Sequence, residues 1–216
     1  MLKGILWDND GVLVDTEYLF FLANKKLLNQ YDLDVTAEDY FDWYLNQNRG
    51  VWHLFDGIGM HASRQAELRE TRNAMFRDII AETEQLKIPG IDNVLDTVAP
   101  QLKMGIVTSA YKDNFLAIHK KTNLLPHFDF VLTSEDYNES KPSPEPYLLG
   151  LDKLGLHADD CIVVEDSPRG LQAAQAAGIR CIVLQHEMTR RFSFDGAYAV
   201  VPSTKELLNV LQNLMA

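Results

Sequence analysis

Short, nearly uninterrupted apolar runs recur along the 216 residues of this chain, and segments with helical periodicity separate most of them. Apolar runs of this length are typical of strands that are buried on both faces of a parallel sheet, because helices cover both sides of such a sheet. The alternation therefore predicts an α/β fold with a Rossmann-like, doubly wound parallel sheet. The strands are expected at residues 3–8, 103–108, 128–133, 161–165, 180–184 and 197–201.

One long segment, residues 15–87, does not fit this alternation. It contains more than half of the aromatic residues of the chain, which indicates a second, smaller hydrophobic core. We therefore predict two domains, a catalytic core formed by residues 1–14 and 88–216 and an inserted α-helical cap domain formed by residues 15–87. The periodicity of the insertion predicts helices only, at residues 17–29, 37–47, 51–55 and 63–85.

Composition and charge exclude several classes of protein. The chain is 46% hydrophobic and 24% charged, which rules out wholesale disorder. Its formal net charge of −11 disfavours nucleic acids and anionic membranes as partners. No stretch reaches the roughly 18 apolar residues of a membrane span, and the first residues form a strand pattern, so a cytoplasmic protein is expected, with a monomer as the default. Cys161 and Cys181 lie in apolar runs and are expected to be buried strand residues.

Polar residues gather where four of the predicted strands end. The carboxyl ends of parallel strands lie along one edge of an open sheet, and ligands bind at that edge. We therefore expect these polar residues to converge on one site, although they are far apart in the sequence. The four clusters are Asp8-Asn9-Asp10, Thr108-Ser109, Lys141 with its neighbours, and Glu165-Asp166.

The residue types in these clusters favour phosphoryl transfer. Crowded carboxylates repel one another unless a hard cation lies among them, and oxygen ligands suit Mg²⁺. Thr108 offers a hydroxyl and Ser109 a backbone N–H to phosphate oxygens, while Lys141 adds a positive charge. Aspartate also serves as a covalent nucleophile toward phosphate. Each cluster alone is more often a turn or a helix cap, but four together at strand ends predict a Mg²⁺-dependent active site.

With these motifs the sequence resembles the haloacid dehalogenase-like hydrolase superfamily, in particular its β-phosphoglucomutase-like phosphatase branch, whose members have a helical cap. The resemblance covers the whole chain and preserves the order and spacing of the motifs. It implies a Rossmann-like core with a cap inserted after the first strand. The matching motifs are DNDGVLVDTE, VTSA, SKPSPEPY and VVEDSPRG.

The resemblance also implies roles for individual residues. Asp8 would be the nucleophile that forms an aspartyl-phosphate, and Asp10 the general acid and base. Mg²⁺ would be held by Asp8, the backbone carbonyl of Asp10 and Asp166, with Glu165 as a further ligand or a partner of the ligands. Dehalogenase members lack the second aspartate, so Asp10 favours phosphoester chemistry. The phosphoryl group would be held by Thr108, Ser109 and Lys141.

Two positions extend or depart from the family pattern. This branch often has a basic residue and a glycine on a cap loop that faces the site, so Arg49 is predicted to contact the substrate. Asn9 occupies a position that is usually apolar in the family, and we expect it to have a structural role. The cap histidines His53 and His61 are expected to be solvated or to pack.

The predicted function is a Mg²⁺-dependent phosphatase that acts on a small phosphorylated metabolite such as a sugar phosphate. A phosphosugar mutase with the same fold is the first alternative. A binding protein without catalytic activity is a remote one, because no member of the predicted site is missing. The resemblance favours hydrolysis, since the mutases of this branch carry a histidine early in the first cap helix and residues 15–21 contain none.

Overall fold

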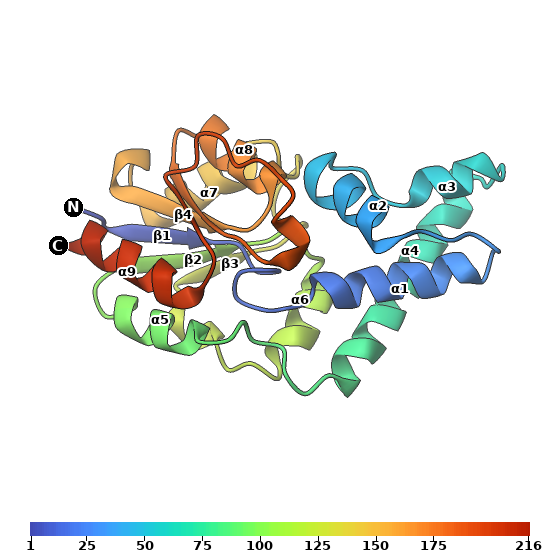
Figure 1. Cartoon of the computed structure of the whole chain (residues 1–216), viewed down its shortest axis with the longest axis horizontal. Helices are drawn as coiled ribbons and strands as arrows, with labels where there is room; N and C mark the ends of the chain where they lie inside the picture. Colours follow the sequence, from blue (N-terminus) through green and yellow to red (C-terminus); the bar gives the residue numbers. More distant parts are fainter.

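The computed structural model describes all residues from 1 to 216 and has a six-stranded parallel sheet at its centre (Figure 1). The strand order is β3-β2-β1-β4-β5-β6, so the first strand lies in the middle and the chain winds outward in both directions. Ile5 of β1, for example, pairs with Met104 on one side and with Ile162 on the other. The predicted doubly wound sheet is confirmed. Its strands are Gly4–Trp7 (β1), Lys103–Val107 (β2), Phe130–Leu132 (β3), Cys161–Glu165 (β4), Arg180–Leu184 (β5) and Ala199–Val201 (β6).

Helices cover both faces of the sheet, which explains the nearly continuous apolar strands. Every residue of β1 and β4 is buried, whereas most residues of the edge strands β3 and β6 are partly exposed. Helices α5, α6 and α9 pack on one face and α7 and α8 on the other (Figure 1). Cys161 and Cys181 are buried free thiols within strands, as predicted. These helices are Ile91–Val98 (α5), Lys112–His119 (α6), Glu145–Leu154 (α7), Pro168–Ala176 (α8) and Thr204–Met215 (α9).

The chain between β1 and α5 forms a separate group of helices beside the carboxyl edge of the sheet (Figure 1). Its own hydrophobic core is rich in aromatic side chains, among which Tyr40 and Phe55 are almost completely buried. The helix predicted at 37–47 instead changes after Phe41 from α-helix to a π-helical turn, Asp42–Asn46. No helix of the protein has both the length and the hydropathy needed to cross a membrane. The four α-helices are Glu17–Asn29 (α1), Ala37–Phe41 (α2), Trp52–Gly57 (α3) and Ala62–Glu82 (α4).

The chain crosses between the sheet and this group of helices twice, and the two crossings are hydrogen-bonded to each other. The Asp15 N–H donates to the Leu86 carbonyl at 2.8 Å, and the Ile88 N–H donates to the Leu13 carbonyl at 3.1 Å. Between these bonds, Val14 pairs with Lys87 in an antiparallel bridge. The helical group is therefore joined to the sheet through one two-stranded neck.

Candidate active site

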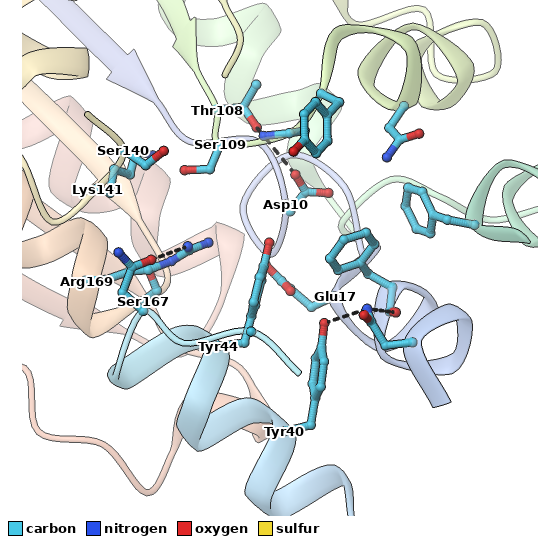
Figure 2. A pocket seen from close by; sticks show the side chains of 18 of the residues that line it. Asp10, Glu17, Tyr40, Tyr44, Thr108, Ser109, Ser140, Lys141, Ser167 and Arg169 are labelled. Carbon is cyan, nitrogen blue, oxygen red and sulfur yellow. Dashed lines mark hydrogen bonds between the residues drawn. The ribbon is translucent and has the colours of Figure 1, made fainter. Parts of the chain in front are cut away.

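The carboxyl ends of β1, β2 and β4 face the group of helices across a cavity of about 220 Å³ (Figure 2). A cavity of this size suits a small metabolite. Lys141 enters it from the loop before α7. The structure thus brings together residues that lie more than one hundred positions apart. The predicted site residues that line the cavity are Asp8, Asp10, Thr108, Ser109, Lys141, Glu165 and Asp166.

The turn after β1 depends on Gly11. This residue has a φ angle of 78°, in the left-handed region that glycine adopts without steric cost. Its N–H donates to the Val14 carbonyl at 2.8 Å, which closes the turn. A Cβ atom at Gly11 would lie only 2.2 Å from Oδ2 of Asp166. Glycine is therefore needed both for the backbone conformation and for the close approach that places Asp8 and Asp10 near Asp166.

A buried lysine joins the ends of three strands, β1, β2 and β4. Nζ of Lys141 donates to Oδ1 of Asp8 at 2.6 Å, to Oε1 of Glu165 at 2.7 Å and to the Val107 carbonyl at 2.9 Å. Burial alone would lower the pKa of Lys141, but the two carboxylates raise it above its usual value. The pKa of Asp8 is raised well above its usual value because burial and the negative charge of Glu165 outweigh the ammonium. Lys141 therefore stays charged beside the predicted nucleophile.

Glu165 is held more tightly than the other carboxylates of the site. Its oxygens accept hydrogen bonds from the Tyr147 hydroxyl at 2.6 Å, the Asp166 N–H at 3.1 Å and the Ser167 hydroxyl at 3.1 Å, in addition to Lys141. Burial would raise the pKa of Glu165, but the Lys141 charge and the hydrogen bonds lower it below the usual range. With both oxygens occupied, Glu165 is better suited to fix Lys141 than to bind a metal directly.

Three carboxylates form a group that fits a divalent cation. Asp8, Glu165 and Asp166 each offer an oxygen atom, and these atoms lie within 4.8 Å of one another. Burial and the neighbouring charge of Glu165 raise the pKa of Asp166 well above its usual value. A hard cation among these oxygens would offset their repulsion. Asp8 and Asp166 are the best placed side-chain ligands, because each accepts only one hydrogen bond, Asp8 from Lys141 at 2.6 Å and Asp166 from Nε2 of His186 at 2.9 Å.

Asp10 is oriented by hydrogen bonds from both sides. The Thr16 hydroxyl donates to its Oδ1, and the Asn9 amide donates to its Oδ2 at 3.2 Å. The Thr108 hydroxyl lies 3.5 Å from the same Oδ2. Asp10 is only partly buried, in contrast to Asp166. It is therefore a carboxylate held in position at the wall of the cavity, as a general acid and base must be.

Asn9 links Asp10 to a histidine behind the site. Oδ1 of Asn9 lies 2.8 Å from Nε2 of His119, and Nδ1 of His119 lies 2.8 Å from the Thr122 hydroxyl. Burial lowers the pKa of His119 to about 4, so the imidazole is neutral at pH 7. Since Asn9 offers an acceptor, Nε2 carries the proton and donates to it, while Nδ1 accepts from Thr122. Asn9 is fully buried, and these contacts support the structural role expected for it.

The loop after β2 offers free donors to a ligand. The Thr108 hydroxyl accepts the Ala110 N–H at 3.0 Å, and the Tyr137 hydroxyl donates to the Thr108 carbonyl at 2.9 Å, so the loop is braced from behind. The Ser109 hydroxyl is buried near Tyr137 but makes no well-aligned hydrogen bond. Ser109 can therefore offer its side chain to a phosphate oxygen, in addition to the backbone N–H expected from the sequence.

The structure does not bring Arg49 to the cavity. Its side chain is exposed, while the neighbouring Asn48 and Gly50 do line the cavity. A substrate contact by Arg49 stays a prediction. Sequence reasoning did not identify the arginines that line the cavity. One of them, Arg169, directly follows the Asp-Ser-Pro motif after β4. The lining arginines are Arg69, Arg72 and Arg169.

Helix α1 and the π-helical turn after α2 also place polar side chains opposite the strand ends. Glu17, in the first turn of α1, is buried, and its pKa is raised well above the usual range by burial and by Asp166 and Asp10. The Arg169 guanidinium lies 4.6 Å from the ring centre of Tyr44. Figure 2 shows Tyr44 and Glu17 facing the side of the cavity that carries Asp10. Glu17 directly follows the Asp-Thr pair of the first motif, and this position in the sequence could have indicated that it belongs to the site.

The fold and the site define the class of the protein as a capped α/β hydrolase with a pair of aspartates after the first strand. Residues 5–184 match the sequence profile of the family described as "Haloacid dehalogenase-like hydrolase", and the chain belongs to this family.

Individual relatives are similar over nearly their whole length. The chain is 28% identical to the phosphorylated carbohydrates phosphatase of Thermotoga maritima, over 99% of this chain and 100% of that protein. A mutant of CbbY from Rhodobacter sphaeroides in complex with xylulose-(1,5)bisphosphate superimposes with a TM-score of 0.83 at 27% identity, over 96% of each chain. The β-phosphoglucomutase of Clostridium difficile, at 23% identity and a TM-score of 0.82 over 100% and 97% of the two chains, shares the fold. The chain is thus a phosphatase-type hydrolase.

Proposed function

We propose that this protein is a Mg²⁺-dependent phosphatase that hydrolyses a small sugar phosphate through an aspartyl-phosphate on Asp8. The observation that carries the proposal is the Asp8 carboxylate, held by the buried Lys141 ammonium in a small cavity that also contains Asp10. The names of two relatives, a phosphorylated carbohydrates phosphatase and a protein bound to a sugar bisphosphate, support a phosphorylated sugar as the substrate class.

The proposed reaction uses the two aspartates in turn. Lys141 binds one oxygen of Asp8, which leaves Oδ2 free of protein donors and able to attack phosphorus. The bond from phosphorus to the leaving alkoxide breaks, and the alkoxide takes a proton from Asp10. Asp10 then removes a proton from a water molecule, which attacks the phosphorus of the aspartyl-phosphate. This second step releases inorganic phosphate and restores the Asp8 carboxylate.

Other residues stabilise the transferred group. Mg²⁺, held by Asp8, Asp166 and the backbone carbonyl of Asp10, would supply positive charge that neutralises the phosphoryl oxygens. Glu165 keeps Lys141 in place and ionised. Thr108 and Ser109 would donate hydrogen bonds to the phosphoryl oxygens, and Lys141, whose three N–H groups contact Asp8, Glu165 and Val107, would attract them through its charge.

A screen of phosphate esters with and without Mg²⁺ tests this proposal. We expect release of inorganic phosphate from sugar phosphates in Mg²⁺, and loss of activity in excess chelator. Ca²⁺ should inhibit, because it prefers more ligands at longer distances than Mg²⁺. Full activity in chelator would contradict the metal assignment, and no hydrolysis of any ester would contradict the phosphatase.

The same protein should release phosphate faster than it isomerises sugar phosphates. The first turns of α1 contain Glu17 and aromatic residues but no histidine that could couple sugar binding to Asp10. Water should therefore compete well for the aspartyl-phosphate. The check is to incubate the protein with β-glucose 1-phosphate and a trace of glucose 1,6-bisphosphate and to follow both products. Glucose 6-phosphate that forms much faster than inorganic phosphate would favour the mutase.

A further inference from the structure

Asn9 is a fully buried amide between the two aspartates of the site, and the turn in which it lies does not need its side chain. The turn is closed by its backbone carbonyl, which accepts three N–H groups, from Val12, Leu13 and Val14. Burial of an amide costs free energy unless its polar atoms are hydrogen-bonded, whereas an apolar side chain of the same size carries no such cost. The amide of Asn9 therefore serves something other than the turn.

His119 orients this amide from behind the site. Its Nε2 lies 2.8 Å from Oδ1 of Asn9, its Nδ1 lies 2.8 Å from the Thr122 hydroxyl, and its ring centre lies 4.3 Å from that of Phe115. In the neutral imidazole one nitrogen donates and the other accepts. With the proton on Nε2, the NH2 group of Asn9 faces Asp10. A proton on Nδ1 would reverse the amide and bring its carbonyl oxygen against the carboxylate, where two acceptors repel each other.

The amide of Asn9 holds one oxygen of Asp10 from the sheet side of the cavity. Its Nδ2 donates to Oδ2 of Asp10 at 3.2 Å, and the Thr16 hydroxyl donates to Oδ1. Thr16 lies beyond the neck, directly before α1, whereas Asn9 and His119 belong to the part of the chain that carries the sheet. Asp10 is thus held by one donor from each of the two parts, and the donor from the sheet side lies next to Asp8 in the chain.

The third contact of Asp10 is one that a bound phosphate would take away. The Thr108 hydroxyl lies 3.5 Å from Oδ2 of Asp10 (Figure 2). A hydroxyl carries a single hydrogen, so Thr108 cannot donate to Asp10 while it donates to a phosphoryl oxygen. Asn9 is then the remaining donor to Oδ2. None of Asn9, His119 and Thr122 lines the cavity, and they therefore act on a substrate only through this carboxylate.

We propose that Asn9, oriented by His119 and Thr122, is a positioning residue that holds the carboxyl group of Asp10 in line for proton transfer to the leaving group. The inference rests on the proposed function, because it takes Asp10 to be the general acid. The proton moves from Asp10 to the alkoxide oxygen as the bond to phosphorus breaks, and the amide and the imidazole keep their own protons. A displacement of about 1 Å can cost on the order of 10²-fold in rate, so a carboxyl group without this donor would transfer its proton more slowly.

The test compares two kinds of leaving group in the variant N9L. The p-nitrophenolate of p-nitrophenyl phosphate leaves without a proton, whereas a sugar alkoxide needs one from Asp10. We would measure kcat/KM, which covers the steps up to the aspartyl-phosphate, for p-nitrophenyl phosphate and for the best sugar phosphate of the screen. N9L should lower kcat/KM at least about tenfold for the sugar phosphate and by no more than about threefold for p-nitrophenyl phosphate. D10N should show the same selectivity with a larger loss.

Substitutions of His119 provide a matched pair for the ratio of the sugar phosphate kcat/KM to the p-nitrophenyl phosphate kcat/KM. A glutamine places an N–H group near the position of Nε2, so H119Q should keep the natural ratio, whereas H119L removes the donor and should lower the ratio about tenfold. H127Q should also keep the ratio, because His127 pairs with Asp96 at the surface. Because Asn9 is buried, N9L can fail to fold, and the two His119 variants then decide. Equal losses for both substrates, no loss for either, or the same ratio in H119Q and H119L would overturn the inference.

Structures of the variants separate this inference from the proposed function. The carboxylate of Asp10 should keep its orientation in crystals of H119Q and change it in crystals of N9L and H119L. A changed orientation would support the positioning of Asp10 even if no ester were hydrolysed. An unchanged carboxylate in N9L and H119L would overturn the inference even if the protein proved to be a phosphatase. In the natural protein at pH 7, nitrogen NMR of His119 should show a proton on Nε2 and none on Nδ1, and the reverse would also overturn it.

Discussion

Asp8 combines two properties at the level of a single residue: one oxygen is fixed by Lys141 and the other is free of protein donors. Asp8→Asn keeps the shape of the side chain but removes the nucleophilic carboxylate. We expect kcat to fall by at least about 10³-fold, because loss of a covalent route is among the most severe changes an active site can undergo. Steady-state phosphate release measures this, and circular dichroism checks that the fold is kept.

The matched control for this prediction is Asp10→Asn. General acid and base catalysis contributes roughly 10²- to 10⁴-fold, so this variant should retain some ability to form the aspartyl-phosphate while its turnover falls. Acid quenching with labelled substrate would detect the covalent species in the Asp10 variant but not in the Asp8 variant. An Asp8→Asn protein that kept more than a few per cent of kcat would contradict the assignment.

His119 makes the stability of the protein depend on pH. Its pKa is about 4 in the folded state and about 6.5 when unfolded, so the unfolded state binds more protons between these values. Its contribution to the free energy of unfolding is complete above about pH 6.5 and is lost as the pH falls toward 4, with a total of roughly 3 kcal/mol. Between pH 7 and pH 5, the free energy of unfolding should therefore fall by about 2 kcal/mol less in His119→Gln than in the natural protein. Urea unfolding at both pH values measures the difference.

The comparison between variants isolates this effect. Buried carboxyl groups such as Glu17, whose pKa is raised, change stability with pH in the opposite direction, but they do so in both proteins and cancel. His61→Gln serves as a control, because His61 is exposed. It should show the pH dependence of the natural protein. If His119→Gln lost as much stability as the natural protein, the neutral donor role of His119 would be wrong.

At the level of secondary structure elements, the start of α8 packs so closely against the end of β4 that no added side-chain atom fits between them. A Cβ atom at Gly170 would lie 1.9 Å from Cδ of Glu165. Gly170→Ala should therefore cost about 1–3 kcal/mol of stability by overpacking. It should also lower kcat/KM, because a displaced Glu165 no longer holds Lys141. Urea unfolding and steady-state kinetics test both effects.

Gly57→Ala is the control for this substitution. Gly57 ends α3, and an added Cβ atom there would meet no atom within 4 Å. The free energy of unfolding of Gly57→Ala should be unchanged or up to about 1 kcal/mol higher, because alanine loses less backbone entropy on folding than glycine. Equal stability losses in both variants would show that the close contact between α8 and Glu165 does not matter.

Elements whose signals are local could be predicted from the sequence. Helix α1 begins and ends at the predicted residues, and Ser167 caps α8 by accepting the Gly170 N–H at 3.2 Å, as its Ser-Pro motif indicates. The change from α-helix to π-helix after Phe41 could not be predicted. It depends on how Tyr40 and its aromatic neighbours pack, and periodicity does not contain that information.

The site shows the same division. Residues at strand ends were identified because parallel topology alone brings them to one edge of the sheet. Residues on the helical side of the cavity were not identified. The packing of a helix against the core decides which of its residues face the cavity, and the sequence does not show this packing. Arg49 was chosen by analogy and is exposed, whereas Arg69 and Arg72, twenty residues further on, line the cavity.

In the molecule as a whole, side-chain contacts join the helical group to the part of the chain that follows β4. Arg191 pairs with Glu38 at 2.9 Å, and Arg169 donates to Asn48 at 3.3 Å. If substrate enters and product leaves by opening of this group, a link between Glu38 and Arg191 should stop turnover. We would make E38C/R191C and join the two thiols with a short reducible crosslinker. Activity should fall on crosslinking and return with reductant.

The single variants E38C and R191C, treated with the same reagent, are the controls. The two natural cysteines are buried and should not react. Each single variant should keep its activity, because neither Glu38 nor Arg191 lines the substrate cavity. A crosslinked double variant with full turnover would show that substrate and product exchange without any relative movement.

The neck formed by Val14 and Lys87 has a consequence for how such a protein can change over time. Since the insertion leaves and rejoins the sheet at adjacent, hydrogen-bonded positions, its removal would leave only a short gap to close. The strand order and the aspartates after β1 do not depend on what lies between the two crossings. Insertions of different size can therefore be exchanged at this one position, and a new specificity can be acquired while the chemistry at the sheet edge stays the same.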